Sequence, residues 1–490
     1  MSSEPPPTPA PGAAPRPFLE AFANRRAAVM LLLGFASGLP LALSTGSLQA
    51  WLTVAGVDLK TIGFFALAGL PYTFKFIWAP LIDRFEPPWA GRRRGWLVLT
   101  QLGLVGAFLL MAELDPATQI DRVGVVAVAI AFLSASQDVV FDAYRSDLLA
   151  ERERGAGAAM SVLGYRLAML VSGGLALILA DQWLGWPATY RLMAGLMAVF
   201  VLVSLLAPAV PPVTALAAVR APARRELLGF AAMLATGLAV WFALRALPWG
   251  ALETDRFGRL LVLTVSLLAS FGAAIRVARA VGFPSFVAPW DAFFSRDRAI
   301  WLLALIVFYK LGDAFAGSLS TTFLIRGVGF TQTEVGAVNK VFGLLATLLG
   351  ALAGGAWLAR ASLYRALMVF GVLQAVSNLG YWVLSVAPRD TMLMAAAVGF
   401  ENLCGGMGTA AFVAFLMALT QREFSAAQFA LLSALAAVGR VYVGPASGVM
   451  VEAIGWPGFF LISVVAALPG LLLLALLRPT IESLQTEKPT

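Results

Sequence analysis

The sequence predicts an all-α protein that crosses a membrane many times, and three observations support this fold class. Of its 490 residues, 60% are hydrophobic and only 13% are charged, whereas a soluble protein averages about 25% charged residues. The hydrophobic residues form blocks of roughly 20, the length that an α-helix needs to cross the core of a bilayer. The blocks lack the strand-like alternation that a membrane β-barrel requires. We therefore expect a polytopic α-helical membrane protein.

Tails and spans can be assigned in order along the chain. The opening SSEPPPTPAPGAAPRPF is Pro-rich, so we expect a disordered tail over residues 1–24. Residues 479–490 form a second short tail. Between the tails we expect fourteen spans, near 27–50, 61–82, 95–114, 122–149, 156–180, 188–208, 226–248, 258–280, 300–325, 334–357, 363–387, 391–418, 425–451 and 456–477.

The basic residues predict the orientation of these spans, because cytoplasmic loops carry an excess of Lys and Arg. The arginines fall in alternate loops: Arg25, Arg26, Arg92, Arg93, Arg94, Arg152, Arg154, Arg224, Arg225, Arg276, Arg279, Arg360 and Arg365. The opposite loops (GVDLK, LDPATQ, DQWLG and SVAPRD) carry few positive charges. Both termini are therefore expected in the cytoplasm. The formal charge of +8 then reflects cytoplasmic loops, and nucleic acid is not an expected partner.

The spans group as six, two and six. We expect a first six-helix bundle over 25–210, two extra helices and a cytoplasmic linker over 211–299, and a second six-helix bundle over 300–478. Two six-helix bundles around a midplane site are the plan of the major facilitator transporters. The linker segment GFPSFVAPWDAFFSRDR predicts a short interfacial helix.

A loop motif supports the same plan. PLIDRFEPPWAGRRRG, residues 80–95, resembles the major facilitator motif between helices two and three, with Asp83 and Arg84 followed by Gly91, Arg92 and Arg93. The spacer is longer than usual, and a plain basic loop would read similarly. The equivalent segment of the second half, GGAWLARASLYR, keeps the glycines and arginines but has no Asp.

The fourth span carries ionisable residues in SASQDVVFDAYRSDLL, residues 134–149. A carboxylate in hydrocarbon is costly, so such residues usually face a cavity or a partner. Asp138 lies past the midplane, about 22 Å from Val123 at about 1.5 Å per residue, and Asp142 is one turn deeper on the same face. We expect both to cluster with Lys75 and Arg166, which fall at similar depth.

Nearer the loop, Arg145 and Asp147 are expected to pair with the region of Asp83 and Arg84 as a cytoplasmic gate.

The second six-helix block has its own interior charges: Lys310, Asp313, Lys340, Glu401 and Arg440. Lys310 and Asp313 are three residues apart, so they can neutralise each other. The surplus of one positive charge suits an anionic substrate. By depth and polarity we select substrate contacts at Gln137, Arg166, Lys310, Asn339, Lys340, Glu401, Asn402 and Arg440.

Each interior charge has an alternative role, since an ion pair can simply lock two helices together. Burying an ion pair seldom improves stability over an apolar pair, however, so we do not expect all of them to be structural. We expect at least one of Asp138, Asp142, Asp313 and Glu401 to bind a transported proton, because a carboxylate away from water protonates more readily.

Several function classes are excluded by what the sequence lacks. It contains no histidine, which removes the usual near-neutral proton acceptor and the commonest metal ligand. It has no phosphate-binding G-x-x-x-x-G-K-[ST] loop and no G-x-S-x-G elbow. We therefore expect no enzyme, no cofactor and no metal, and coupling to a proton gradient rather than to ATP.

Long segments resemble one known family. They include LLGFASGLPLALSTGSLQAW, FKFIWAPLIDR, SASQDVVFDAYRSDLL, YKLGDAFAGSLSTTFLIRGVGF and ENLCGGMGTAAFVAFLMAL. On these segments the chain resembles the muropeptide permeases of Gram-negative bacteria, the AmpG family of the major facilitator superfamily. The resemblance also covers the two extra central helices.

The resemblance implies import across the inner membrane of N-acetylglucosaminyl-1,6-anhydro-N-acetylmuramyl peptides, driven by protons, for peptidoglycan recycling. In some bacteria such import induces β-lactamase. It implies as partners the substrate, protons and the lipid bilayer, and we expect a monomer.

Two rival functions stay open. One is a proton-coupled transporter of another bulky anionic, peptide or sugar solute. The other is a non-transporting sensor or assembly factor on the same fold.

Overall fold

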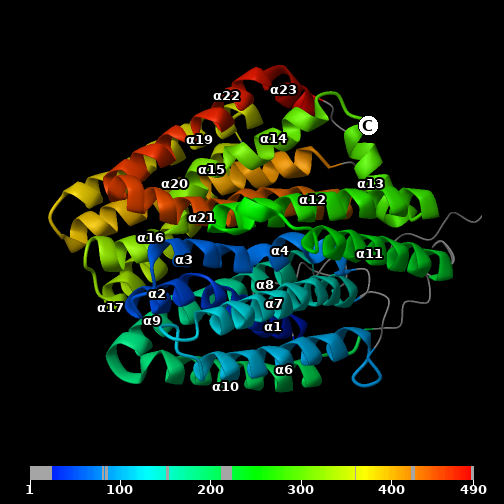
Figure 1. Ribbon diagram of the computed structural model, residues 1–490, viewed down its shortest axis with the longest axis horizontal. Helices are drawn as coiled ribbons and strands as arrows, with labels where there is room; N and C mark the ends of the chain where they lie inside the picture. The colour runs from blue at the N-terminus through cyan, green and yellow to red at the C-terminus, as the bar shows by residue number, and fades with distance from the viewer. Residues whose placement is uncertain are drawn as a thin grey trace, which may run out of the picture. The chain divides into compact units, whose positions relative to one another are not determined.

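The computed structural model describes residues 25–79, 82, 87–149, 154–210, 223–358, 360–420 and 425–486. In this part of the chain every regular element is a helix (Figure 1). The predicted disordered tail over 1–24 lies outside the described residues. The chain divides into two compact units, with residues 212–303 and 420–430 in the smaller one. The larger unit holds both six-helix bundles.

The first bundle extends from residue 25 to residue 206. Its elements are α1 (Arg25–Ser44), α2 (Gly46–Val54), α3 (Leu59–Phe64), η2 (Phe65–Gly69), α4 (Leu70–Phe74), η3 (Lys75–Ile77), α6 (Arg92–Ala112), α7 (Ile120–Leu148), α8 (Arg154–Met169), η5 (Leu170–Leu175), α9 (Ala176–Leu179), η6 (Ala180–Leu184) and α10 (Gly185–Leu206). Here α1 packs against α8, and α6 packs against α7 and α10.

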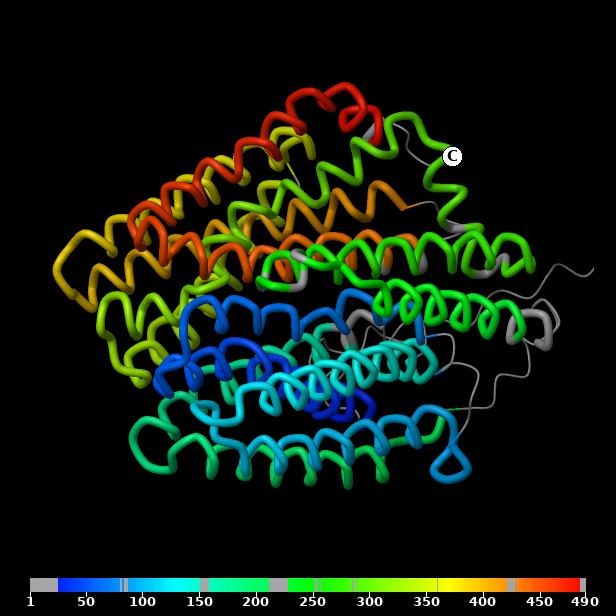
Figure 2. Tube along the Cα trace, viewed as in Figure 1, coloured from blue at the N-terminus to red at the C-terminus, as the bar shows by residue number. Residues whose placement is uncertain are grey.

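The second bundle begins near residue 299. Its elements are α14 (Ala299–Tyr309), α15 (Leu311–Ser318), α16 (Ser320–Thr322), η8 (Phe323–Gly327), α17 (Gln332–Val335), η9 (Gly336–Phe342), α18 (Gly343–Leu358), α19 (Leu363–Val386), α20 (Thr391–Ala418), α21 (Ser425–Val465), α22 (Leu468–Leu476) and α23 (Arg478–Thr486). Helix α20 packs between α18 and α19. Figure 2 traces the first bundle from dark blue to blue-green and the second from yellow-green to red.

The smaller unit is a helical pair with a short third helix. Its elements are α11 (Ala223–Arg245), η7 (Gly250–Glu253), α12 (Arg256–Val281) and α13 (Pro284–Phe294). Helix α13 confirms that the linker forms a short helix, while its interfacial placement stays a prediction. The stacked pairs Phe283–Phe286 and Trp290–Phe294 lie along it.

Eleven helices among the described residues are long and apolar enough to cross a membrane. Two of them, 159–206 and 431–476, each contain a positive-φ glycine, Gly185 and Gly455, and each is long enough for two crossings. The predicted second span over 61–82 is broken into short α and 3-10 pieces around Gly69 and Pro71. A proline lacks the N–H that would continue a helix. The multi-span class is confirmed, while the count of fourteen stays a prediction.

Close contacts between helices depend on glycine at several positions. A Cβ on Gly354 would lie 2.8 Å from the Cα of Met407, and one on Gly38 would lie 3.0 Å from the Cα of Tyr165. A side chain at either place would therefore separate the two helices. These glycines therefore let the helices approach closely.

Two apolar cores organise the larger unit. One includes Trp51, Tyr190, Phe323 and Phe460 and joins both bundles at the end that carries few arginines. The other includes Val29, Phe141 and Tyr144 and lies within the first bundle. The first bundle also contains the arginine-rich end of the unit, where Arg94 donates to the carbonyl of Ala207 at 3.1 Å. We call the opposite, arginine-poor end the outer end.

Candidate functional site: two charge sets and an outer latch

The first charge set lies on α7, in the middle of the first bundle. The hydroxyl of Ser37 on α1 donates a hydrogen bond to the Asp138 carboxylate. The positive charge of Lys75 also acts on Asp138. Asp138 thus has a direct partner in Ser37, whereas Lys75 acts on it only through space.

Gln137 next to Asp138 is 1% exposed, and both of its amide atoms lack a hydrogen-bond partner among the described residues. Buried polar atoms are normally hydrogen-bonded. An unpaired amide inside a bundle thus suits a group that arrives from outside the chain.

Asp142 does not pair with Lys75 or Arg166, which corrects the expected four-residue cluster. It forms an ion pair with Arg145 at 3.0 Å, and its side chain is 56% exposed. The physical reason is local, because residues three apart on a helix are neighbours on one face. Asp142 still acts electrostatically on Asp138. Arg166 instead places its guanidinium 3.8 Å from the sulfur of Met169.

The expected gate pairing of Arg145 and Asp147 with Asp83 and Arg84 stays a prediction, while other partners of Asp147 are described. Its carboxylate binds Arg93 at 2.8 Å and Arg92 at 3.3 Å. Both arginines belong to the loop motif, so Asp147 ties α7 to the start of α6. Asp83 and Arg84 lie outside the described residues.

The second charge set begins at Lys310. Its ammonium lies 3.4 Å from Asp313, 3.4 Å from the amide oxygen of Gln374 and 3.3 Å from the hydroxyl of Thr409. The predicted pairing of Lys310 with Asp313 is therefore present. Neither Gln374 nor Thr409 was predicted from the sequence, because a neutral polar residue within a span does not stand out from its neighbours as a charged residue does.

Glu401 and Asn402 lie together on α20. The Asn402 amide donates to Glu401 at 2.8 Å and accepts from Thr347 on α18 at 2.9 Å. Lys310, Asp313 and Lys340 all act electrostatically on Glu401. This connects Lys310, Asp313, Lys340 and Glu401 into one set, without Arg440.

Three further predicted residues have separate surroundings. Lys340 donates to Thr321 at 3.1 Å. The side-chain nitrogen of its neighbour Asn339 is buried without a partner among the described residues. Arg440 on α21 is exposed.

Metal binding has no support in the part of the chain that the structure describes, where no group of three His, Cys, Asp or Glu side chains is placed to hold an ion.

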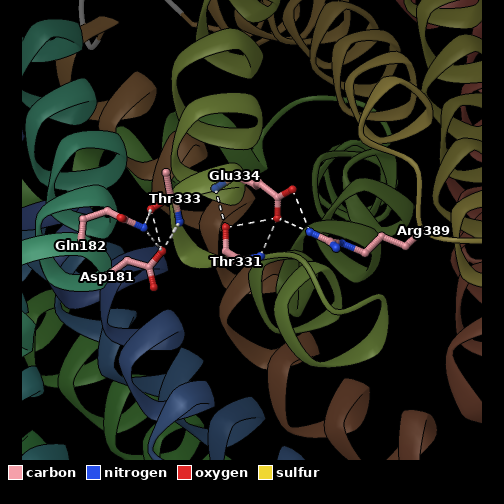
Figure 3. A network of polar contacts seen from close by, with 6 residues as sticks. All are labelled: Asp181, Gln182, Thr331, Thr333, Glu334 and Arg389. Carbon is pink, nitrogen blue, oxygen red and sulfur yellow. Dashed lines mark hydrogen bonds and ion pairs between the residues drawn. The ribbon is translucent and has the colours of Figure 1, made fainter.

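The outer end carries a polar network that connects the two bundles (Figure 3). Asp181 of the first bundle accepts from the backbone N–H of Thr333 at 3.0 Å and from its hydroxyl at 2.6 Å. Gln182 donates to the Thr333 hydroxyl at 2.9 Å. We call Asp181, Gln182 and Thr333 the outer latch. A carboxylate at a helix N-terminus is favoured by the partial charge there, and Thr333 lies in the first turn of α17.

The second bundle supports the latch from behind. Thr331 caps α17 in a capping box with Glu334. Glu334 in turn forms an ion pair with Arg389 at 2.7 Å. These contacts hold the first turn of α17 in place on the side away from Asp181 (Figure 3).

Other contacts between the bundles lie at the same end. Among pairs in which both residues are described, they are Gln49 with Ser318, Thr53 with Thr322, Arg326 with Val57 and Thr53, Trp186 with Gln332, and Lys60 with Glu452. The outer end is therefore closed by side chains from both bundles.

The sequence contained one usable signal for the latch. The segment TQTE at 331–334 has the capping-box spacing that marks a helix start. Its partner, the lone Asp181 in DQWLG, has no local signal, because the contact spans 152 residues of sequence.

Comparison with known proteins identifies the family. Residues 27–184 match the family described as Acetyl-coenzyme A transporter 1. An anhydromuropeptide permease of Escherichia coli is 52% identical over 465 residues, which is 95% of this chain and 82% of that protein. An uncharacterized protein of Haemophilus influenzae is 30% identical, covering 93% of this chain and 95% of that one.

Solved structures share the fold at low identity. A mutant of the peptide transporter POT superposes with a TM-score of 0.66 at 14% identity, over 93% of this chain and 94% of that one. A D-xylose-proton symporter gives 0.62 at 11% identity, over 94% and 97%. These likenesses confirm the predicted major facilitator fold.

Proposed function

This chain belongs to the anhydromuropeptide permease family, and on that premise we propose that it imports anhydro-muropeptides across the bacterial inner membrane by proton symport. The Escherichia coli relative is named for this solute. The imported products would feed peptidoglycan recycling. The identity of 52% over 95% of the chain is the observation that carries the proposal.

The closed outer end supports alternating access. Among the described residues, side-chain hydrogen bonds between the bundles join the arginine-poor end, through the outer latch and through Arg326. With both termini in the cytoplasm, as the arginine pattern favours, this end faces the periplasm. Closure of the periplasmic end is what release of substrate to the cytoplasm requires in alternating access.

We assign the proton to the carboxylates of the two charge sets, Asp138 and Asp142 in the first bundle and Asp313 and Glu401 in the second. Asp138 is the leading candidate, because it lies inside the first bundle and accepts from the neutral hydroxyl of Ser37, a partner that either protonation form can keep. Asp142 forms an ion pair with Arg145, and its side chain is more than half exposed. Arg145 and Arg166 serve as charge partners near this set.

For the substrate we retain the residues selected by depth and polarity. Gln137 and Asn339 have unpaired amide atoms, and Lys310, Lys340, Asn402 and Arg166 offer donors inside the bundles. Glu401 and Arg440 complete the set. Both charge sets lie within one chain, so a monomer suffices for transport.

A second candidate is import of another bulky anion. The match of residues 27–184 to an acetyl-coenzyme A transporter family favours it. Uptake of labelled N-acetylglucosaminyl-anhydromuramyl peptide into proteoliposomes, with competitors, separates the two. We expect competition by unlabelled muropeptide and none by coenzyme A esters or free amino sugars. Competition by coenzyme A esters alone would favour the second candidate, and a folded protein that moves no solute would favour a sensor.

A further inference from the structure

The side chain of Lys340 crosses from the second bundle into the first along a track of glycines. A Cβ on Gly174 would lie 3.5 Å from the Lys340 Cβ, and one on Gly173 would lie 4.0 Å from its Cδ. A Cβ on Gly46 would lie 3.5 Å from Cε and 3.0 Å from Nζ. The lysine side chain therefore passes three positions that carry no side chain and ends beside the start of α2. We call Gly46, Gly173 and Gly174 the glycine track.

The backbone around Lys340 is irregular. Lys340 lies in the π-helix η9, and Gly173 and Gly174 lie in the π-helix η5 of the other bundle. The two π-helices contact each other. Such segments are rare and are frequent at functional sites.

Lys340 has no acidic partner in contact among the described residues, which separates it from Lys310. Its hydrogen-bond partner is the neutral hydroxyl of Thr321. Glu401 acts on it only through space, and no ion pair within 4.0 Å forms. An ammonium that lies inside a bundle without a contacting carboxylate can pair with a carboxylate of a ligand.

Two neighbouring features favour the same type of ligand. The buried side-chain nitrogen of Asn339 is a donor without a partner. The first turn of α2 begins at Gly46, where backbone N–H groups carry partial positive charge. Among the described residues, the Lys340 ammonium contacts one acceptor, the hydroxyl of Thr321.

We propose that Lys340 is the anchor for a carboxylate of the peptide stem of the substrate, bound between the two bundles beside Gly46. This inference rests on the proposed function, and it identifies Lys340 as the side chain that recognises a negative charge of the substrate. The carboxylate would replace the hydroxyl of Thr321 as the partner of the ammonium. Because the lysine belongs to one bundle and its track to the other, a carboxylate bound there contacts both halves at once.

The test compares two substrates that differ only in charge. We would measure competition against labelled muropeptide uptake in proteoliposomes, using the unlabelled muropeptide and the same compound with its stem carboxylates amidated. For the wild type we expect the free acid to compete at least about tenfold better, the size of one charge-assisted hydrogen bond. In Lys340→Met this preference should fall to near one, and in Lys340→Arg it should persist.

Control variants make the outcome specific. Lys60→Met applies the same change at the outer end, and it should keep the wild-type preference. If Lys340→Met does not fold, Gly46→Ala tests the same point, since its methyl would contact only the end of the lysine side chain. Its matched control is Gly195→Ala, where a Cβ meets nothing within 4 Å. Gly46→Ala should weaken the free acid and spare the amide, and Gly195→Ala should change neither.

The results separate the two levels of the proposal. A wild type that takes up no muropeptide contradicts the proposed function itself. A wild type that takes up free acid and amide equally, or a folded Lys340→Met that keeps the full preference, overturns the role of Lys340 and leaves the proposed function in place.

Discussion

Asp138 and Asp142 look equivalent in sequence but differ in their surroundings. They are one helical turn apart on α7. Asp138 accepts from Ser37 and is reached by the charge of Lys75. Asp142 is paired with Arg145 and is more than half exposed. An exposed ion pair contributes little to stability or specificity, so the two carboxylates should respond differently to neutralisation.

We predict that Asp138→Asn abolishes proton-driven uptake, because the amide cannot take up and release a proton. Asp142→Asn should retain uptake within about threefold of the wild type, since it loses only an exposed pair worth under about 1 kcal/mol. Initial rates of muropeptide uptake across a range of outside pH would measure both. Wild-type rates and pH dependence in Asp138→Asn would remove that residue from the proton pathway.

At this scale the sequence predicted which charged residues lie inside the bundles better than how they pair. Polarity inside apolar blocks identified Asp138, Lys310 and Glu401, because a charge in hydrocarbon stands out against its neighbours. The partners Ser37 and Thr321 were missed, since hydroxyl side chains are common in any membrane helix. The glycine track of Lys340 depends on two bundles meeting and has no local signal.

Among the elements, the helices of each bundle are held together by glycines that admit a neighbouring backbone. Gly350 on α18 is one example: a Cβ there would lie 2.8 Å from the carbonyl carbon of Leu403. Gly355 on the same helix faces open space, where a Cβ meets nothing within 4 Å. One helix thus offers a buried and an open glycine for direct comparison.

We predict that Gly350→Ala destabilises the protein by about 1–3 kcal/mol, the usual cost of forcing extra volume into a packed contact. Gly355→Ala should be neutral or slightly stabilising, because alanine favours the helix over glycine. Thermal unfolding of the two purified variants in detergent would compare them. Equal melting temperatures of the two variants would contradict this prediction, because they would show that α18 and α20 can move apart without loss of stability.

The sequence predicted most elements from hydrophobic length but not their interruptions. The spans over 61–82 and 300–325 are each divided into several short helical pieces. Gly69 and Pro71 indicated a weak point in the first of them. The π-helices η5 and η9 could not be expected, because an extra residue in a turn is stabilised by tertiary contacts rather than by local propensity.

On the scale of the whole molecule, the larger unit is joined at its outer end by contacts between two bundles. The outer latch carries several of them, with Asp181 bound to the N–H and the hydroxyl of Thr333. A transporter that alternates must break such contacts in every cycle. A change that weakens the latch should therefore shift the population towards the state open at the outer end.

We predict that Asp181→Ala shifts this equilibrium by about tenfold, because it removes hydrogen bonds to a charged group. Spin labels at Leu184→Cys and Met392→Cys would report the separation, since both positions are exposed, at 42% and 79%. Cys404 is the only cysteine and is buried, so it need not be replaced. The expected result is a new, longer distance between the labels.

The control for this experiment is Arg191→Gln. It breaks an ion pair with Glu113 at the same end but within the first bundle and away from the latch, so the label distances should stay close to those of the wild type. An Asp181→Ala protein with unchanged distances would contradict the role of the latch.

The arrangement of two bundles could be predicted from the sequence, while its conformational state could not. Grouped spans and alternating arginines are properties of the chain in every state. Which end is closed depends on contacts such as Arg326 with the carbonyl of Val57, across 269 residues. Both states must be accessible to the same sequence, so no local pattern selects between them.

The central claim is proton-driven import of anhydro-muropeptides, and one measurement tests it most directly. Labelled N-acetylglucosaminyl-anhydromuramyl peptide would be offered to proteoliposomes with an inward proton gradient, with and without an uncoupler. We predict accumulation that the uncoupler abolishes. Uptake that the uncoupler leaves unchanged would contradict proton coupling and the role of Asp138 in it.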